Sequence, residues 1–166
     1  SKYKKQIFIY GSTHLKKKFK LNYINLKLTK IFELSKTKAY VDEFIKHENK
    51  DTSDIIEIHN RPKYAFLIKK RCNAKIVFYF HNDPLTMQGS STVIERLKLL
   101  EICDKLIFNS DFCKKQFLKN LKNKIINTSK ILTIKQSTKK TNVNLANKKK
   151  YITFVGKLNR SKGYDI

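Results

Sequence analysis

Short runs of apolar residues alternate with longer amphipathic segments along the chain. Runs of strand length occupy residues 6–11, 22–28, 54–60, 74–80, 104–110, 129–138 and 151–159. Most of them are apolar at nearly every position, which is typical of strands that are buried in a parallel sheet. The pattern therefore predicts a series of strands joined by helical connections.

The segments between these runs have helical spacing of their apolar residues. Ser35 is placed to cap a helix that begins after it, and Pro62 is placed in the first turn of a second helix. Two further helices are predicted in "STVIERLKLL" and "DFCKKQFLKNL". Their expected apolar positions are Val93, Ile94, Leu97 and Leu100 in the first, and Phe112, Phe117 and Leu121 in the second.

Strands alternating with helices predict an α/β fold, in which a mostly parallel sheet carries helices on both faces. Residues 1–138 are expected to form one domain and the polar residues 139–150 a linker. Residues 151–166 are then the first strand and loop of a second domain. We expect the chain to be a piece of a longer polypeptide that continues at both ends.

The formal net charge of +24 raises the question of an anionic partner. Only four of the 37 basic residues are arginine, the residue that makes bidentate contacts to guanine and phosphate. Together with the abundance of Lys, Asn, Ile, Phe and Tyr, this favours an A+T-rich coding bias over a nucleic-acid surface. Peripheral contact with an anionic membrane stays open.

Three cysteines without CxxC spacing, Cys72, Cys103 and Cys113, indicate free thiols in a reducing cytoplasm. No apolar run approaches the roughly 20 residues that span a bilayer. The chain has no P-loop, no G-x-G-x-x-G fingerprint and no G-x-S-x-G elbow. We therefore expect neither a nucleoside-triphosphate site nor a serine-hydrolase triad in this part of the chain.

Polar residues follow several of the predicted strands, at the edge where parallel sheets bind ligands. They are His59-Asn60-Arg61, His81-Asn82-Asp83, Asn109-Ser110 and Gly156-Lys157. His59 is interpreted as structural, and His81 is open between a turn residue and a site residue. Neither histidine has a ligand partner at zinc-binding spacing, so no metal is expected.

The segment "FVGKLNRSKGYDI" places a glycine and three basic residues between a strand and a helix start. Gly156 allows close approach of the backbone to a ligand, and Lys157, Arg160 and Lys162 bring positive charge to the same loop. This arrangement suits a diphosphate. Any basic loop of a lysine-rich chain would look similar, so both interpretations stay open on chemistry alone.

The same segment resembles the start of the C-terminal domain of family-4 retaining glycosyltransferases, which have the GT-B fold of two Rossmann-like domains. "DIIEIHNRP", "IVFYFHNDP", "CDKLIFNSDFCKKQF" and "ILTIKQST" resemble upstream segments of that family in the same order. The resemblance covers residues 54–166. It implies that residues 1–138 form a Rossmann-like N-terminal domain on the acceptor side of the cleft.

The resemblance implies roles for individual residues. Lys157 and Lys162 match the basic pair that holds the donor diphosphate, and Gly156 matches the glycine beside the phosphates. His81 falls at the strand end where the family places a histidine near the donor sugar. Among the strand-end residues we also expect Asn82, Asn109 and Ser110 to line the donor site.

The implied activity is transfer of a sugar from a nucleotide-diphosphate donor to a glycan or lipid-linked acceptor, with retention, in cytoplasmic synthesis of surface polysaccharide or lipopolysaccharide. The family's Gly-rich loop and glutamate pair are missing, so residues 1–166 alone are expected to be inactive. A basic nucleic-acid-associated domain and a GT-B sugar-nucleotide epimerase are the alternatives.

Overall fold

The computed structural model describes residues 7–12, 22–28, 35–48, 53–121 and 128–137. The chain divides into two compact units, residues 1–136 and 137–166, and all the elements described below belong to the first. The expected linker at residues 139–150 and the expected start of a second domain at residues 151–166 lie outside the described residues.

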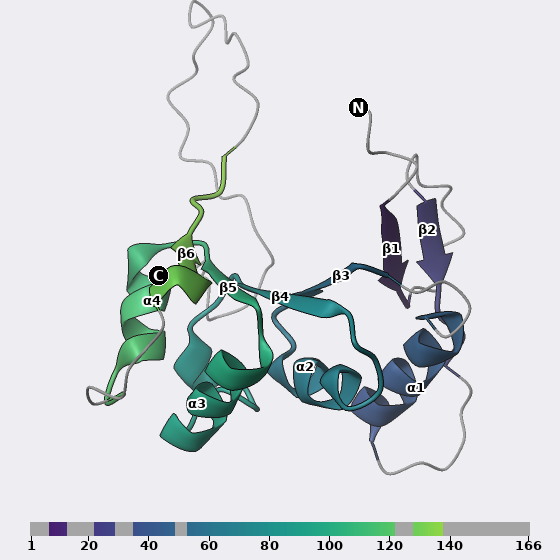
Figure 1. Cartoon of the computed structure of the whole chain (residues 1–166), viewed down its shortest axis with the longest axis horizontal. Helices are drawn as coiled ribbons and strands as arrows, with labels where there is room; N and C mark the ends of the chain where they lie inside the picture. The colour runs from purple at the N-terminus through teal and green to yellow at the C-terminus, as the bar shows by residue number, and fades with distance from the viewer. Residues whose placement is uncertain (1–6, 13–21, 29–34, 49–52, 122–127, 138–166) are drawn as a thin grey trace, which may run out of the picture. The chain divides into compact units, whose positions relative to one another are not determined.

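The described strands form two parallel sheets (Figure 1). β1 and β2 make a two-stranded sheet, and β3, β4, β5 and β6 make a four-stranded sheet in that order. Their bounds are Phe8–Gly11, Asn22–Asn25, Ile55–His59, Lys75–Phe80, Lys105–Phe108 and Ile131–Thr133. The predicted α/β fold with a Rossmann-like parallel sheet is confirmed.

Helices connect the strands at the predicted places, and local sequence explains where each begins. Pro62 opens α2, the Ser110 hydroxyl caps α4 by accepting from the Cys113 N–H, and Thr92 caps α3 in a reciprocal capping box with Glu95. The helices are α1 (Lys36–Glu48), α2 (Pro62–Lys69), α3 (Val93–Ile102) and α4 (Asp111–Leu118), with short 3-10 turns η2 (Pro84–Thr86) and η3 (Thr128–Lys130).

The strands of the larger sheet lie side by side in their order along the chain. Right-handed crossovers between strands in this order place every connecting helix on the same face. Side chains at alternate strand positions are accordingly buried beneath α2, α3 and α4, while those between them are not. Of the two helical layers that the sequence predicted, the described residues contain one.

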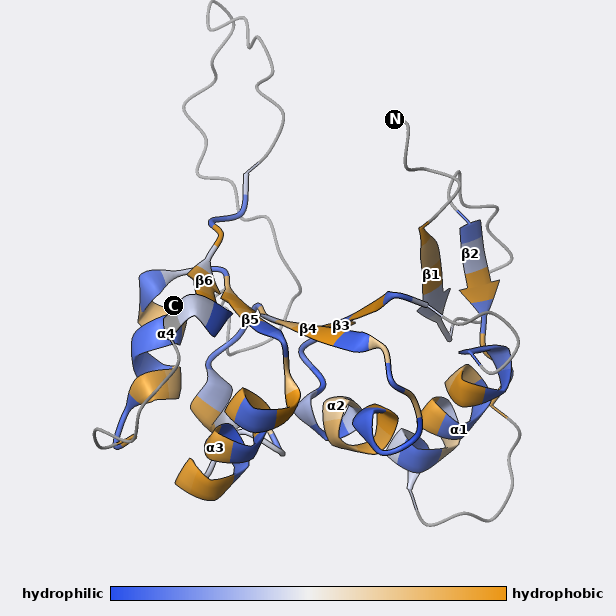
Figure 2. Cartoon of the chain, in the orientation of Figure 1, coloured by the Kyte–Doolittle hydropathy of each residue, from blue (hydrophilic) through white to orange (hydrophobic). Residues whose placement is uncertain are grey.

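The buried face of the sheet is built from aliphatic and aromatic side chains. Phe80 and Phe108 stack with ring centroids 5.1 Å apart, and Phe117 of α4 packs against both at 5.4 and 5.2 Å. Figure 2 shows hydrophobic colouring along β4 and β5 and on parts of α2, α3 and α4. Burial of rings of this size supplies most of the favourable free energy of a small core.

Two predicted core residues are on the outside, and this part of the prediction was wrong. Ile94 is 79% exposed and Phe112 is 58% exposed, whereas Arg96 is only 2% exposed. Arg96 is buried because its guanidinium donates hydrogen bonds to the carbonyl oxygens of Ser90, Ser91 and Lys119. These acceptors turn α3 so that Leu99, rather than Ile94, faces the sheet.

The prediction that all three cysteines are free is confirmed.

Candidate functional site

The carboxyl ends of β3, β4 and β5 bring polar side chains to one edge of the four-stranded sheet. His59 is the last residue of β3, His81 follows β4 directly, and Asn109 follows β5. The register pairs His59 with Tyr79, so His81 lies two residues beyond that pair. Since the strands are parallel, residues far apart in the chain meet at this edge.

Two of these side chains, His59 and His81, form a continuous line of hydrogen bonds with Glu57 and Gln136. The Glu57 carboxylate lies 2.8 Å from His59 Nε2, and His59 Nδ1 lies 2.7 Å from His81 Nε2. The Gln136 Nε2 lies 3.0 Å from His81 Nδ1, 55 residues away in sequence. Both ring nitrogens of both histidines are therefore engaged, which holds the two rings in one orientation.

Tyr79 packs against both imidazole rings and limits their movement. Its ring centroid lies 5.5 Å from that of His59 and 4.4 Å from that of His81, and the ring planes differ by 13° and 8°. The Tyr79 hydroxyl donates a hydrogen bond to the Ile134 carbonyl oxygen at 2.9 Å. The stack is thus tied to β4 and to the segment after β6.

Two asparagines fix the backbone of His81. Asn60 has a φ of 51°, a left-handed conformation that asparagine tolerates better than most residues. Its side-chain oxygen accepts from the His81 N–H at 2.7 Å, and Asn109 Nδ2 donates to the His81 carbonyl oxygen at 2.7 Å. The Ser110 hydroxyl donates to Asn109 Oδ1 at 3.2 Å. His81 is held on its main chain as well as its ring.

The environment favours the neutral imidazole of His81. Burial, followed by the neighbouring His59, lowers the pKa of His81, while the Glu57 carboxylate raises it by less. A neutral ring carries one donor nitrogen and one acceptor nitrogen. His81 at neutral pH is therefore suited to hydrogen bonding in a defined direction rather than to charge pairing.

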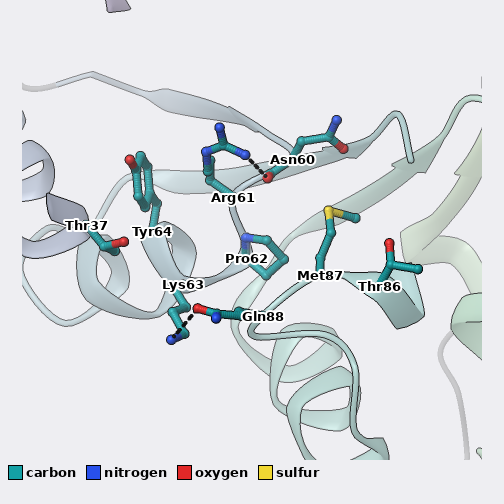
Figure 3. A pocket seen from close by; sticks show the side chains of 9 residues that line it. All are labelled: Thr37, Asn60, Arg61, Pro62, Lys63, Tyr64, Thr86, Met87 and Gln88. Carbon is teal, nitrogen blue, oxygen red and sulfur yellow. Dashed lines mark hydrogen bonds between the residues drawn. The ribbon is translucent and has the colours of Figure 1, made fainter. Parts of the chain in front are cut away.

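An open pocket of about 290 Å³ lies next to this site, and Asn60 borders both (Figure 3). Arg61 donates to the Asn60 carbonyl oxygen at 3.1 Å, and Lys63 donates to Gln88 Oε1 at 2.9 Å. No carboxylate pairs with either cation among the described residues. The remaining lining residues are Thr37, Pro62, Tyr64, Thr86 and Met87.

Gly89, in the loop after η2, lies close to the start of α2, which lines the pocket. This residue has a φ of 93°, and a Cβ atom added there would lie 3.0 Å from the backbone nitrogen of Lys63. Glycine is required on both counts, since other residues are strained at this φ and the added carbon would press on the start of α2. The loop after η2 can therefore approach α2 closely.

The structure brings together three of the predicted site residues: His81, Asn109 and Ser110. Ser110 also caps α4, so its hydroxyl is already used in local structure. Asn82 is exposed, with no hydrogen bond to its side chain among those of the described part of the chain. The predicted Gly156, Lys157 and Lys162 lie outside the described residues.

Sequence reasoning missed Glu57 and Gln136 and treated His59 as structural. One signal was available: the dipeptide His-Asn follows two successive strands, at His59-Asn60 and His81-Asn82. Strands that neighbour each other in a parallel sheet bring such repeated ends together. The contact of Gln136 with His81 had no comparable signal in the sequence.

Comparison with models of known protein families and with curated protein sequences finds no match to this chain. Within the described ranges, no group of three or more His, Cys, Asp or Glu side chains is arranged to hold a metal ion. Nor does any helix in those ranges have the length and apolar character needed to cross a membrane.

Proposed function

We propose that this chain forms the acceptor-side domain of a retaining glycosyltransferase that uses a nucleotide-diphosphate sugar. The observation that carries the proposal is the convergence of His59, His81 and Asn109 at the carboxyl edge of the parallel sheet. That edge is where open α/β sheets bind ligands. The family resemblance of the segments that end at these residues adds support.

In this proposal His81 contacts the donor sugar. Its backbone is held by Asn60 and Asn109, and its ring by His59 and Tyr79. A group held in this way loses little freedom when the ligand binds, which is the condition for accurate positioning of a reacting sugar. Lys157 and Lys162 would stabilise the charge that develops on the leaving diphosphate, and no metal is needed for that role.

The pocket beside Asn60 is the proposed place for the acceptor. Arg61 and Lys63 project along its border, and the ring of Tyr64 forms one wall (Figure 3). Cations without carboxylate partners attract a phosphate group, such as the one that a lipid-linked acceptor carries. The pocket and His81 share Asn60, so donor and acceptor would meet across one residue.

The test is sugar transfer by the complete gene product. The protein is incubated with nucleotide-diphosphate sugars and membrane lipid extract, and products are identified by mass spectrometry and anomeric NMR couplings. We expect a retained anomeric configuration, and a His81→Ala variant about 100-fold slower, because a misplaced reacting group costs a factor of that order. His47→Ala, which changes a histidine on α1, is the matched control.

Two results would contradict the proposal. One is equal transfer by the His81→Ala and His47→Ala variants, which would remove His81 from the site. The other is release of free sugar and nucleotide with no glycoside formed by the unmodified protein, which would favour the epimerase alternative. Residues 1–166 alone are expected to give no transfer.

A further inference from the structure

In each hydrogen bond of the line from Glu57 to Gln136, the donor and the acceptor can be assigned from the chemistry of the two atoms. A carboxylate only accepts hydrogen bonds, so the 2.8 Å contact requires the His59 proton to be on Nε2. The Gln136 amide nitrogen only donates, so its 3.0 Å contact makes Nδ1 of His81 an acceptor and leaves the His81 proton on Nε2. That proton is donated across the 2.7 Å contact, so Nδ1 of His59 is also an acceptor.

The contact between His81 and Gln136 agrees with these proton positions. With its proton on Nε2, the neutral ring of His81 has a bare lone pair on Nδ1. The amide nitrogen of Gln136 donates to this lone pair at 3.0 Å. All three contacts are satisfied by a single arrangement of protons, with Glu57 ionised and both rings neutral.

The surroundings support this arrangement. The rings of His59 and His81 are nearly parallel, with centroids 5.1 Å apart and planes 11° apart. Tyr79 lies against both, so neither ring turns over without disturbing the stack. A 180° flip of either ring about its Cβ–Cγ bond would put Cδ2 in the place of Nδ1 and Cε1 in the place of Nε2, and would break the hydrogen bonds on both sides of that ring.

We propose that Glu57 and His59 are positioning residues that keep Nδ1 of His81 a hydrogen-bond acceptor, so that the group bound there is a donor such as a hydroxyl of a neutral sugar. A phosphate or carboxylate oxygen, which only accepts, is rejected at this nitrogen. The amide of Gln136 occupies the place of that hydroxyl. The inference rests on the proposed function only for the identity of the ligand as a sugar.

The test is NMR of side-chain nitrogens in the ¹⁵N-labelled chain. We expect His81 with Nδ1 unprotonated and with an Nε2 proton that exchanges slowly with water. Glu57→Ala should cause loss of the slowly exchanging Nε2 proton signals of both histidines, because His59 is no longer anchored. Glu57→Gln should retain them, since the glutamine oxygen still accepts from His59.

Glu43→Ala is the matched control, because Glu43 is ion-paired to Lys46 on α1, away from the stack. It should leave both signals unchanged while the far-ultraviolet circular dichroism of all variants stays the same. A proton on Nδ1 of His81 in the unmodified chain would overturn the inference. Unchanged signals in Glu57→Ala would do so too.

A second arm tests the chemistry of the ligand with inorganic phosphate as the probe. Phosphate added at constant pH should leave Nδ1 of His81 unprotonated, because this nitrogen offers no proton to an anion. Protonation of Nδ1 on phosphate addition would overturn the inference. The NMR result is independent of transfer, so a protein that fails the transfer assay but shows the anchored protons disproves the proposed function alone.

Discussion

The two faces of the four-stranded sheet use the same strands for different purposes. On the face under the helices, Ile76, Phe78, Phe80, Leu106 and Phe108 are all fully buried. On the opposite face, the intervening positions of β3 and β4 carry Glu57, His59 and Tyr79, which are exposed or half-buried. Side chains alternate across a strand, so every second residue serves packing and the others are free for chemistry.

The contrast shows why the candidate site lies on the open face. A hydrogen-bonded line of carboxylate, imidazoles and amide needs partial contact with water, because burying such groups fully is costly. On the covered face the same groups would disrupt an apolar core. The strands are thus fixed from one side by packing, and the other side carries the hydrogen-bonded side chains of the candidate site.

The largest effect is expected from truncation on the covered face. Phe80→Ala should reduce the free energy of unfolding by about 3–5 kcal/mol, since it removes a fully buried ring between Phe108 and Phe117. Tyr79→Ala, one residue away on the open face, should cost about 1–2 kcal/mol, because its ring is partly exposed. Urea unfolding followed by circular dichroism measures both effects. An equal loss in the free energy of unfolding for the two variants would contradict the difference between the two faces.

A second pair of substitutions compares the buried and the exposed side of α3. Leu99→Ala should cost about 2–5 kcal/mol because Leu99 is fully buried. Ile94→Ala should change stability by about 0.5 kcal/mol or less, since Ile94 is 79% exposed. Thermal unfolding of the two variants decides whether α3 faces the sheet as described, and a greater loss for Ile94→Ala would show that it does not.

A smaller effect is expected at the loop bordering the pocket. Gly89→Ala should cost about 1–3 kcal/mol, since alanine is strained at this backbone conformation and its Cβ would press on the start of α2. Ser90→Ala, one residue further on, removes the hydroxyl that donates to the Pro84 carbonyl oxygen without changing the backbone. If Gly89→Ala proved as stable as the unmodified chain, the close approach of this loop to α2 would be wrong.

The smallest effect is expected at the cap of α3. Thr92→Ala should cost about 1 kcal/mol, because the hydroxyl accepts from the Glu95 N–H at 3.2 Å.

Burial raises the pKa of Glu95, but hydrogen bonds from Thr92 and Ser91 outweigh it and lower the pKa overall. The stabilisation by Glu95 is thus present above its unfolded-state pKa and lost as pH falls through the lower folded-state value.

That pH dependence is measurable by urea unfolding at a series of acidic pH values. Glu95→Gln should flatten the part of the curve in which stability falls with decreasing pH. The matched control is Glu101→Gln, at an exposed glutamate near the end of α3. It should leave the fall of stability with decreasing pH unaltered. Identical curves for Glu95→Gln and the unmodified chain would show that the reciprocal cap is not formed.

The sequence predicted the strands and helices well because each apolar run is bounded by polar residues or by a capping residue. Every predicted element within the described residues is present; each strand is shorter than its predicted run, and α3 extends two residues beyond its predicted segment, to Ile102. Which side chains of α3 face the sheet was not predictable from apolar spacing. The orientation depends on the burial of Arg96, and that burial depends on carbonyl groups of Ser90, Ser91 and Lys119.

The candidate site was predictable in part. His81, Asn109 and the edge they share follow from the order of parallel strands. The line through Glu57, His59 and Gln136 depends on strand register and on the turn after β6, which short-range patterns do not determine. The two His-Asn dipeptides were the one local sign that two strand ends meet.

The proposed function requires that the sugar of a nucleotide-diphosphate donor binds at the strand ends, on the face of the sheet that carries His81 and Asn109. The most direct measurement is backbone and side-chain NMR of the labelled chain titrated with a panel of nucleotide-diphosphate sugars and the corresponding nucleotides. We predict that at least one sugar donor shifts His81, Asn109 and Gln136, and that its nucleotide without the sugar does not. Shifts confined to surface lysines, falling steeply with added salt, would contradict the claim and favour a nucleic-acid partner instead.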